Sequence, residues 1–178
     1  MQDEVIMAGF GGQGIMLIGK MLAYAGLAEG NEVCWLPSYG PEMRGGTANC
    51  TVVVSDRPIG SPIVQNPRCA VVMNRPSLER FGPDVKPGGI VIINSTLIDI
   101  VPDRDDITIH QVPANEIAAE LELPKSANIV ILGAYIEASG IVELKSIKAL
   151  IEKQFGKKPK MVEINFKALD KGAESVRS

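Results

Sequence analysis

The stretch EVIMAGFGGQG at residues 4–14 decides the fold, because an apolar run passes directly into a glycine-rich turn. Residues 4–8 are typical of a short buried strand. Residues 15–28 are rich in Ala, Leu, Met and Gly, which predicts a helix packed closely on a sheet and ended by Gly30 and Asn31. Residues 32–36 form the next expected strand. This β-turn-helix-β unit predicts a parallel pair of strands with a right-handed crossover.

The rest of the chain continues the alternation of strands and helices and then becomes helical. The sequence predicts an α/β fold, a three-layer Rossmann-like open and mostly parallel sheet flanked by helices, with a helical C-terminal third. The length of 178 residues predicts a single domain that spans residues 1–178. The further expected strands are 47–55, 70–73, 90–93 and 107–112, with a short edge strand at 59–64, and the expected helices are 76–81, 114–121, 128–139, 142–155 and 164–176.

Composition narrows the class of protein. Apolar residues make up 46% of the 178 residues, charged residues 22%, and the net charge is −3, so nothing favours a nucleic-acid or membrane partner. The first ten residues lack the basic segment of a signal peptide, which favours a cytoplasmic location. Cys34, Cys50 and Cys69 are widely spaced without a CxxC pair. We therefore expect buried thiols, and neither a metal site nor an iron–sulfur cluster held by this chain alone.

Gly9, Gly11 and Gly14 match the dinucleotide pattern GxGxxG directly after a strand and before a helix. Glycines permit close backbone approach, and the helix N-terminus offers free N–H groups to an anion. The second strand, however, is followed by Pro37-Ser38, where an acidic residue should meet the ribose hydroxyls. Gln13 also adds an amide that the pattern does not require. NAD or FAD binding, other anion contacts and a purely structural turn all remain open.

A second candidate segment, SYGPEMRGG, follows the second strand and should reach the same carboxyl edge of the sheet as the glycine turn. Arg44 could hold a carboxylate or phosphate bidentately, and Tyr39 could donate a hydrogen bond. An internal Glu42–Arg44 ion pair is the structural alternative. The candidate site residues from both segments are Gly11, Gly12, Gln13, Gly14, Ser38, Tyr39, Gly40, Pro41, Glu42, Arg44, Gly45 and Gly46.

Taken together, AGFGGQGI and SYGPEMRGG resemble the gamma subunit of 2-oxoacid:ferredoxin oxidoreductases and the corresponding domain of pyruvate:ferredoxin oxidoreductases. The resemblance extends through VVVSD, KPGGIVIINS and NIVILGAYIEASG, and so covers nearly the whole chain. The turn and the loop look more like the 2-oxoglutarate or branched-chain (ketoisovalerate) type than the pyruvate type.

The resemblance implies oxidative decarboxylation by a complex that uses thiamine diphosphate, Mg, iron–sulfur clusters and CoA. The chain lacks the thiamine-binding and cluster-binding segments, so it should bind none of these alone and carry no catalytic residue of its own. The implied partners are alpha and beta subunits, an optional ferredoxin-like delta subunit, and ferredoxin as acceptor. The candidate residues would line an interface near the active centre. A self-sufficient nucleotide-binding oxidoreductase and a non-catalytic interaction module are the alternative functions, and the isolated chain could form a homodimer.

Overall fold

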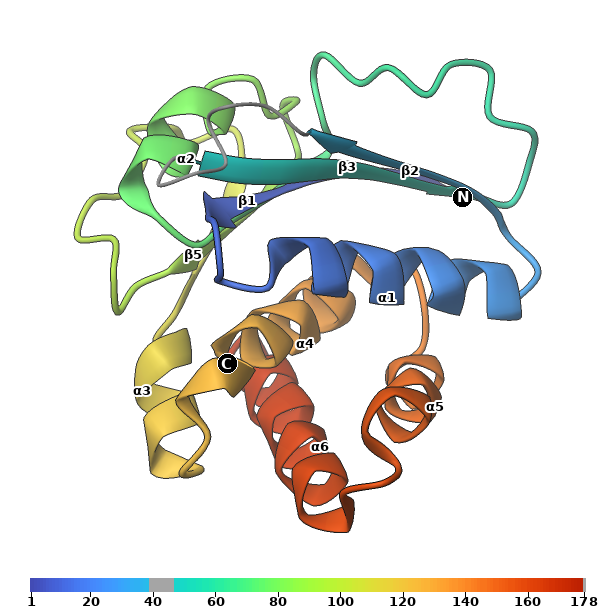
Figure 1. Cartoon of the computed structure of the whole chain (residues 1–178). Helices are drawn as coiled ribbons and strands as arrows, with labels where there is room; N and C mark the ends of the chain where they lie inside the picture. Colours follow the sequence, from blue (N-terminus) through green and yellow to red (C-terminus); the bar gives the residue numbers. More distant parts are fainter. Residues whose placement is uncertain (39–46, 178) are drawn as a thin grey trace.

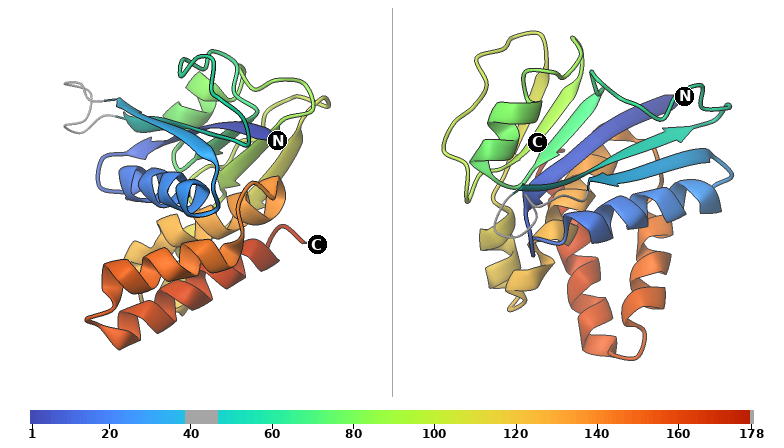
Figure 2. Two further views of the ribbon diagram at one scale, coloured as in Figure 1. Left: turned by 90° about the vertical axis from the view of Figure 1, so that its right-hand side faces the viewer. Right: turned by 45° about the horizontal axis from the view of Figure 1, so that its top comes forward.

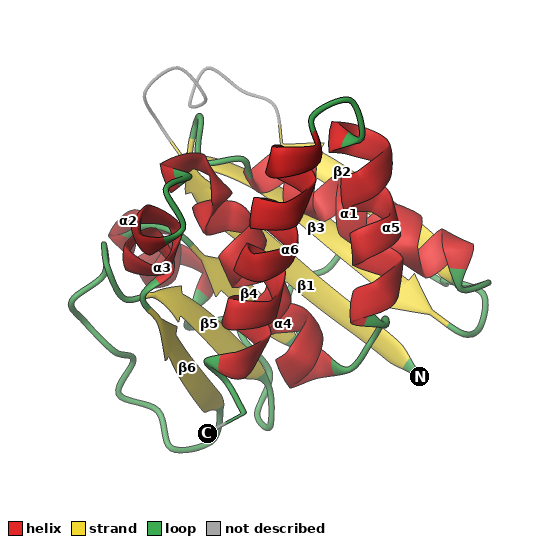
Figure 3. Cartoon of the chain, turned by 90° about the horizontal axis from the view of Figure 1, so that it is seen from below, coloured by secondary structure: helices red, strands yellow, loops and turns green. Residues whose placement is uncertain are grey.

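A single six-stranded sheet runs through the molecule (Figure 1), and its strands follow the order β2-β3-β1-β4-β5-β6 (Figure 3). The computed structural model describes residues 1–38 and 47–177. The strands are β1 (Gln2–Phe10), β2 (Glu32–Ser38), β3 (Thr47–Ser55), β4 (Cys69–Val72), β5 (Ile90–Asn94) and β6 (Thr108–Val112).

The helices follow the predicted order. Helix α6 begins at Pro159, five residues before the predicted start, because proline is favoured in the first turn of a helix. The edge strand expected at residues 59–64 is wrong: residues 56–68 form a loop, where prolines at 58, 62 and 67 cannot donate to a ladder. The helices are α1 (Ile15–Ala28), α2 (Arg75–Phe81), α3 (Ala114–Glu120), the 3-10 turn η2 (Pro124–Ser126), α4 (Ala127–Ser139), α5 (Leu144–Phe155) and α6 (Pro159–Glu174).

The pairing of the strands corrects one expectation. Three pairings, β1–β4, β4–β5 and β5–β6, are parallel, but β1 and β2 do not pair with each other. Strand β3 lies between them and is antiparallel to both. The inner position suits β3, whose Cys50, Val52 and Val54 are buried in the core. The edge position suits β2, because Pro37 lacks the N–H that an inner strand would need.

Most of the helices cover one face of the sheet. Helix α1 lies directly on the sheet, and α4 packs beneath both α1 and the sheet. Helices α5 and α6 form a hairpin that extends farther from the sheet (Figures 1 and 2). The short helix α2 covers the other face over β1 and β4, where its Leu78 joins a separate small core. The three-layer arrangement is thus confirmed, although the layers differ greatly in thickness.

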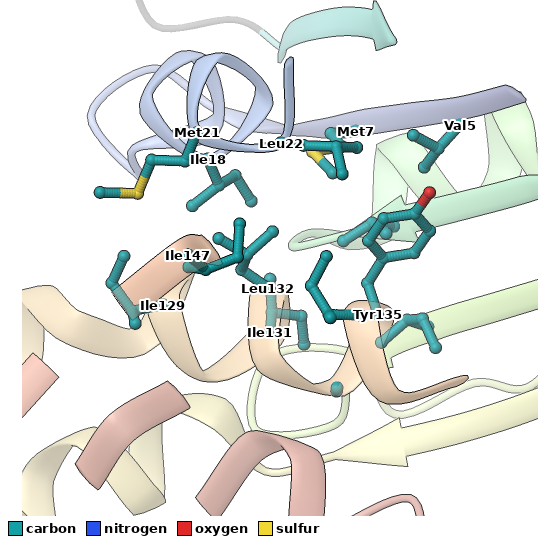
Figure 4. Close-up of a cluster of buried hydrophobic side chains, with 14 of the residues drawn as sticks. Val5, Met7, Ile18, Met21, Leu22, Ile129, Ile131, Leu132, Tyr135 and Ile147 are labelled. Atoms are coloured by element: carbon teal, nitrogen blue, oxygen red, sulfur yellow. The ribbon is translucent and has the colours of Figure 1, made fainter. Parts of the chain in front are cut away.

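Helix α4 is the centre of the core. Every residue from 127 to 136 is buried, because the helix packs against α1 and the sheet on one side and against α6 on the other. Figure 4 shows Leu132 of α4 facing Ile18 and Leu22 of α1, whereas Tyr135 of α4 lies next to Val5 and Met7 of β1. An apolar helix without a polar face is typical of this fully enclosed position.

Helices α4 and α6 meet at two glycines. A Cβ atom on Gly133 would overlap the carbonyl oxygen of Leu169, and a Cβ atom on Gly172 would overlap that of Val130. The two backbones therefore touch without intervening side chains. Small residues at a helix crossing allow this close approach.

We expect Gly133→Ala to destabilise the chain, because the added methyl group must push α6 away from α4. Overpacking of this kind costs about 3 kcal/mol of unfolding free energy, which urea denaturation followed by circular dichroism would measure. Gly60→Ala is the control, since a Cβ atom there meets nothing within 4 Å, and it should change stability by less than about 0.5 kcal/mol. Equal stability of the two variants would contradict the tight crossing.

Candidate functional site

The carboxyl ends of β1 and β4 form a topological switch point. Strand β1 leads into α1, which lies on one face of the sheet, whereas β4 leads into α2 on the opposite face. The connections therefore diverge and leave a crevice between the two strand ends. Open α/β sheets bind ligands in such crevices.

The glycine turn is tied to the end of β4 through Gln13. The side-chain oxygen Oε1 of Gln13 accepts a hydrogen bond from the N–H of Phe10 at 2.6 Å. Its Nε2 donates to the carbonyl oxygen of Met73 at 3.4 Å, and the N–H of Met73 donates to the carbonyl of Ala8 at 2.9 Å. Gln13 thus shapes the turn from within.

Gly14 begins helix α1 in a left-handed conformation with φ 76° and without a side-chain cap. Its carbonyl oxygen accepts a hydrogen bond from Nδ2 of Asn128 at 3.2 Å. Asn128 is 5% exposed and lies in the first turn of α4. A residue with a Cβ atom at position 14 would be strained by the positive φ and would also overlap the Asn128 amide. The sequence feature that could have indicated this role of Asn128 is its position as a single amide at the start of an almost wholly apolar helix.

A cavity of about 530 Å3 opens beside this turn. Its walls come from the glycine turn and α1, from the end of β4, from α3 and the start of α4, and from the facing ends of α5 and α6. Amide and apolar side chains dominate, and Asn115 is held in place by Nδ2 of Asn94 at 2.7 Å. The lining residues are Gly12, Gln13, Gly14, Leu17, Met73, Asn115, Leu123, Pro124, Lys125, Ser126, Ala127, Asn128, Ile129, Phe155, Met161 and Asn165.

The predicted site residues divide into three groups. Gly12, Gln13 and Gly14 line the cavity, whereas Gly11 is exposed and does not. Ser38 is exposed at the end of β2 and is not part of the lining. Tyr39, Gly40, Pro41, Glu42, Arg44, Gly45 and Gly46 lie outside the described residues. Thr47, which follows them, pairs with Phe10 at the start of the glycine turn.

The dinucleotide interpretation loses its structural basis. In the Rossmann arrangement an acidic residue at the end of the adjacent second strand meets the ribose. Here β3 separates β2 from β1, and β2 ends in Leu36, Pro37 and Ser38. The cavity also lies on the α4 side of the turn, away from β2. The structure thus disfavours NAD or FAD in the usual orientation.

The cysteines and the histidine lie away from the cavity. Cys50 and Cys69 are buried, and Cys34 is half-buried on β2. Burial raises the pKa of Cys50 to about 11 and lowers the pKa of the half-buried His110. In the described part of the chain no three His, Cys, Asp or Glu side chains gather as a metal site would require. None of the described helices has the length and apolar character needed to cross a bilayer.

This geometry defines the class of protein: an α/β domain with a cavity at the switch point of its sheet. A family model described as pyruvate ferredoxin/flavodoxin oxidoreductase matches residues 4–175, and the chain belongs to that family. The subunit VorA of ketoisovalerate oxidoreductase from Methanothermobacter marburgensis is 42% identical over 98% of this chain and 36% of its own length. The subunit KorC of 2-oxoglutarate synthase from the same organism is 35% identical over 99% of this chain and 97% of its own.

Two solved structures share the fold. The gamma subunit of a keto/oxoacid ferredoxin oxidoreductase from Geobacter sulfurreducens superposes with a TM-score of 0.84 at 26% identity and covers 98% of both chains. A 2-oxoglutarate:ferredoxin oxidoreductase from Magnetococcus marinus, with 2-oxoglutarate, coenzyme A and succinyl-CoA bound, has a TM-score of 0.90 at 26% identity. That match covers 99% of this chain and 31% of the longer one. The chain thus spans only about a third of the length of that neighbour and of VorA.

We predict that Gly14→Ala and Asn128→Ala are energetically coupled. In the wild-type background, Gly14→Ala should cost about 1–2 kcal/mol for the left-handed backbone, plus the overlap with the Asn128 amide. In the Asn128→Ala background the overlap is relieved and only the backbone strain remains. A double-mutant cycle in urea should therefore give a coupling of roughly 1 kcal/mol or more. Additive effects would show that Asn128 does not hold the turn.

We also predict that the buried thiols resist alkylation in the native chain. At pH 8, raising the pKa of Cys50 from 9.0 to about 11 lowers its thiolate fraction about a hundredfold. Iodoacetamide should therefore modify Cys34 first, and all three cysteines only after unfolding in urea, as peptide mass mapping would show. Rapid native labelling of Cys50 would contradict the packing of β3 under α1.

Proposed function

We propose that the chain is the gamma-type subunit of a thiamine diphosphate-dependent 2-oxoacid:ferredoxin oxidoreductase complex. The complex converts a 2-oxoacid and coenzyme A to acyl-CoA and carbon dioxide and passes two electrons to ferredoxin. Family membership over residues 4–175 and relatives named as subunits of such enzymes support the proposal. The chain works in the cytoplasm with alpha and beta subunits and, in complexes that have one, a ferredoxin-like delta subunit.

The redox and thiamine chemistry belongs to the partner subunits. The three cysteines do not fit an iron–sulfur cluster, because each lies on a different strand and two are buried in the core. The described residues likewise offer no group of carboxylates for a Mg²⁺ ion. We therefore assign no electron-transfer or bond-breaking step to this chain.

The chain's own contribution is the cavity at the switch point. We assign it to coenzyme A, because its walls combine apolar side chains with amides that suit the amide-bearing arm of that molecule. The uncapped N-terminus of α1 adds free backbone N–H groups beside Gly14. The Magnetococcus enzyme, whose structure holds coenzyme A and succinyl-CoA, supports this assignment, because one part of it shares the fold of this chain.

We further propose that the loop of Tyr39, Gly40, Pro41, Glu42, Arg44, Gly45 and Gly46, together with Ser38 and Gly11, packs against the thiamine-bearing subunits. The observation that supports this placement is the pairing of Phe10 with Thr47, which brings the end of the loop to the start of the glycine turn. The substrate would be 2-oxoglutarate or a branched-chain 2-oxoacid, in keeping with the names VorA and KorC.

The first test is co-purification of the tagged chain from its native cells. We expect thiamine- and cluster-bearing subunits in the eluate, and reduction of methyl viologen that requires both coenzyme A and a 2-oxoacid. Assays with 2-oxoglutarate, ketoisovalerate and pyruvate would identify the substrate. An isolated chain that binds NAD(H) tightly and recruits no subunits would instead favour a self-sufficient oxidoreductase.

Reconstituted complexes with Arg44→Ala or Gly12→Ala test the site itself. Each variant should lower kcat/KM at least severalfold, because one removes a charged loop residue and the other strains a turn residue with φ 89°. Arg57→Ala is the matched control, since Arg57 is exposed and lines a separate hollow with Gln2 and Glu4. Complexes that assemble and turn over like wild type with both variants would exclude these loops from the site.

A further inference from the structure

We propose that Lys125, assisted by Lys157 and Lys158, binds the phosphate groups of the coenzyme that the cavity accepts. The inference rests on the proposed function, because it names the residues that recognise the charged end of the ligand. The three lysines belong to two separate segments, the 3-10 turn η2 and the turn between α5 and α6.

The charge of the cavity wall is the first observation. Lys125 is the one ionisable side chain among the lining residues, and no carboxylate lines the cavity within the described chain. This is unusual for a protein with 21 acidic residues against 18 basic ones. A cavity with a cation at its wall and no acid favours a ligand with negative charge.

The second observation is the position of Lys157 and Lys158. They lie between Phe155 and Met161, which both line the cavity. Two backbone hydrogen bonds close this turn: the N–H of Lys158 donates to the carbonyl of Phe155 at 2.7 Å, and the N–H of Met161 donates to that of Lys158 at 2.9 Å. The two lysines therefore lie in a short turn between two lining residues, next to the cavity wall but not part of the lining itself.

Ion pairing separates these three lysines from some of the other lysines, although not from all of them. Lys148 and Lys167 pair with carboxylates on α6, at 2.8 and 2.6 Å. Lys125, Lys157 and Lys158 have no such partner within 4.0 Å in the described part of the chain. The next lysine along α6, Lys160, instead lines a hollow with three glutamates, Glu120, Glu122 and Glu163. Positive charge is thus left uncompensated at the cavity.

The shape and chemistry of the cavity favour a small phosphorylated ligand over an acidic protein surface. Lys125 lines a concave space of about 530 Å3, within the range that encloses small molecules. Leu17, Ile129 and Phe155 contribute apolar wall, and Asn115 and Asn165 contribute amides. A pantetheine arm suits that interior, and the phosphates then fall at the rim near the lysines. Ammonium groups bind phosphate as point charges.

The test is the KM for coenzyme A of the assembled complex with Lys125→Gln, and with Lys157→Gln and Lys158→Gln combined. Loss of one charge-assisted contact should raise the KM for coenzyme A about tenfold for Lys125→Gln, with kcat unchanged. The KM for pantetheine, which carries no phosphate, should not change. Lys145→Gln is the control, because it removes the same charge at the opposite end of α5, where Lys145 pairs with Glu143.

Leu17→Trp separates the two proposals, since it fills the cavity without changing charge. If it raises the KM for coenzyme A and pantetheine while the lysine variants change neither, the assignment of the lysines is overturned and the cavity assignment stands. If neither Leu17→Trp nor the lysine variants affect either KM, both assignments fall. If the lysine variants raise the KM for ferredoxin and leave that for coenzyme A unchanged, the rim binds an acidic protein and the present assignment is wrong.

Discussion

The complete burial of helix α4 is the constraint on which the other parts of the structure depend. Its side chains fill the space under α1, and its backbone touches α6 through Gly133 and Gly172. Two hydrogen bonds anchor α4, one near each end of strand β1. Asn128 donates to the carbonyl of Gly14 at one end, and at the other the Tyr135 hydroxyl donates to Asp3 at 2.6 Å. Neither end of α4 can shift without leaving a buried polar group unpaired, which costs about 1–3 kcal/mol.

The burial of α4 also determines where the cavity lies. Because α4 is held under the sheet, its first turn and the preceding η2 must lie beside the glycine turn. Because α6 is held against α4 by backbone contact, the start of α6 and the end of α5 close the opposite wall. The cavity therefore combines residues from the first, second and last thirds of the chain. Its shape depends on the helical C-terminal third as much as on the glycine turn.

The sequence predicted the elements well and their arrangement less well. Long runs of apolar, helix-favouring residues that end at glycines located α1 and α4 almost to the residue. The neighbour of β1 was missed, because an apolar strand such as β3 does not reveal which strands it will pair with. The cavity wall formed by Lys125 and Phe155 was also missed. No local pattern indicates that these two residues, far apart in the sequence, will face the same space, since only the packing of α4 against α6 brings them together.

The glycine turn illustrates why a matching pattern does not imply a matching ligand. In a dinucleotide site the turn keeps its N–H groups free for the pyrophosphate. Here the Gln13 side chain folds back and accepts a hydrogen bond from the N–H of Phe10. One N–H group at the turn is therefore already paired within the protein. What remains free is the uncapped first turn of α1 beside the cavity. The same glycines that would admit a pyrophosphate here admit the side chains of Gln13 and Asn128, and the anion contacts that we propose belong to the cavity beside the turn.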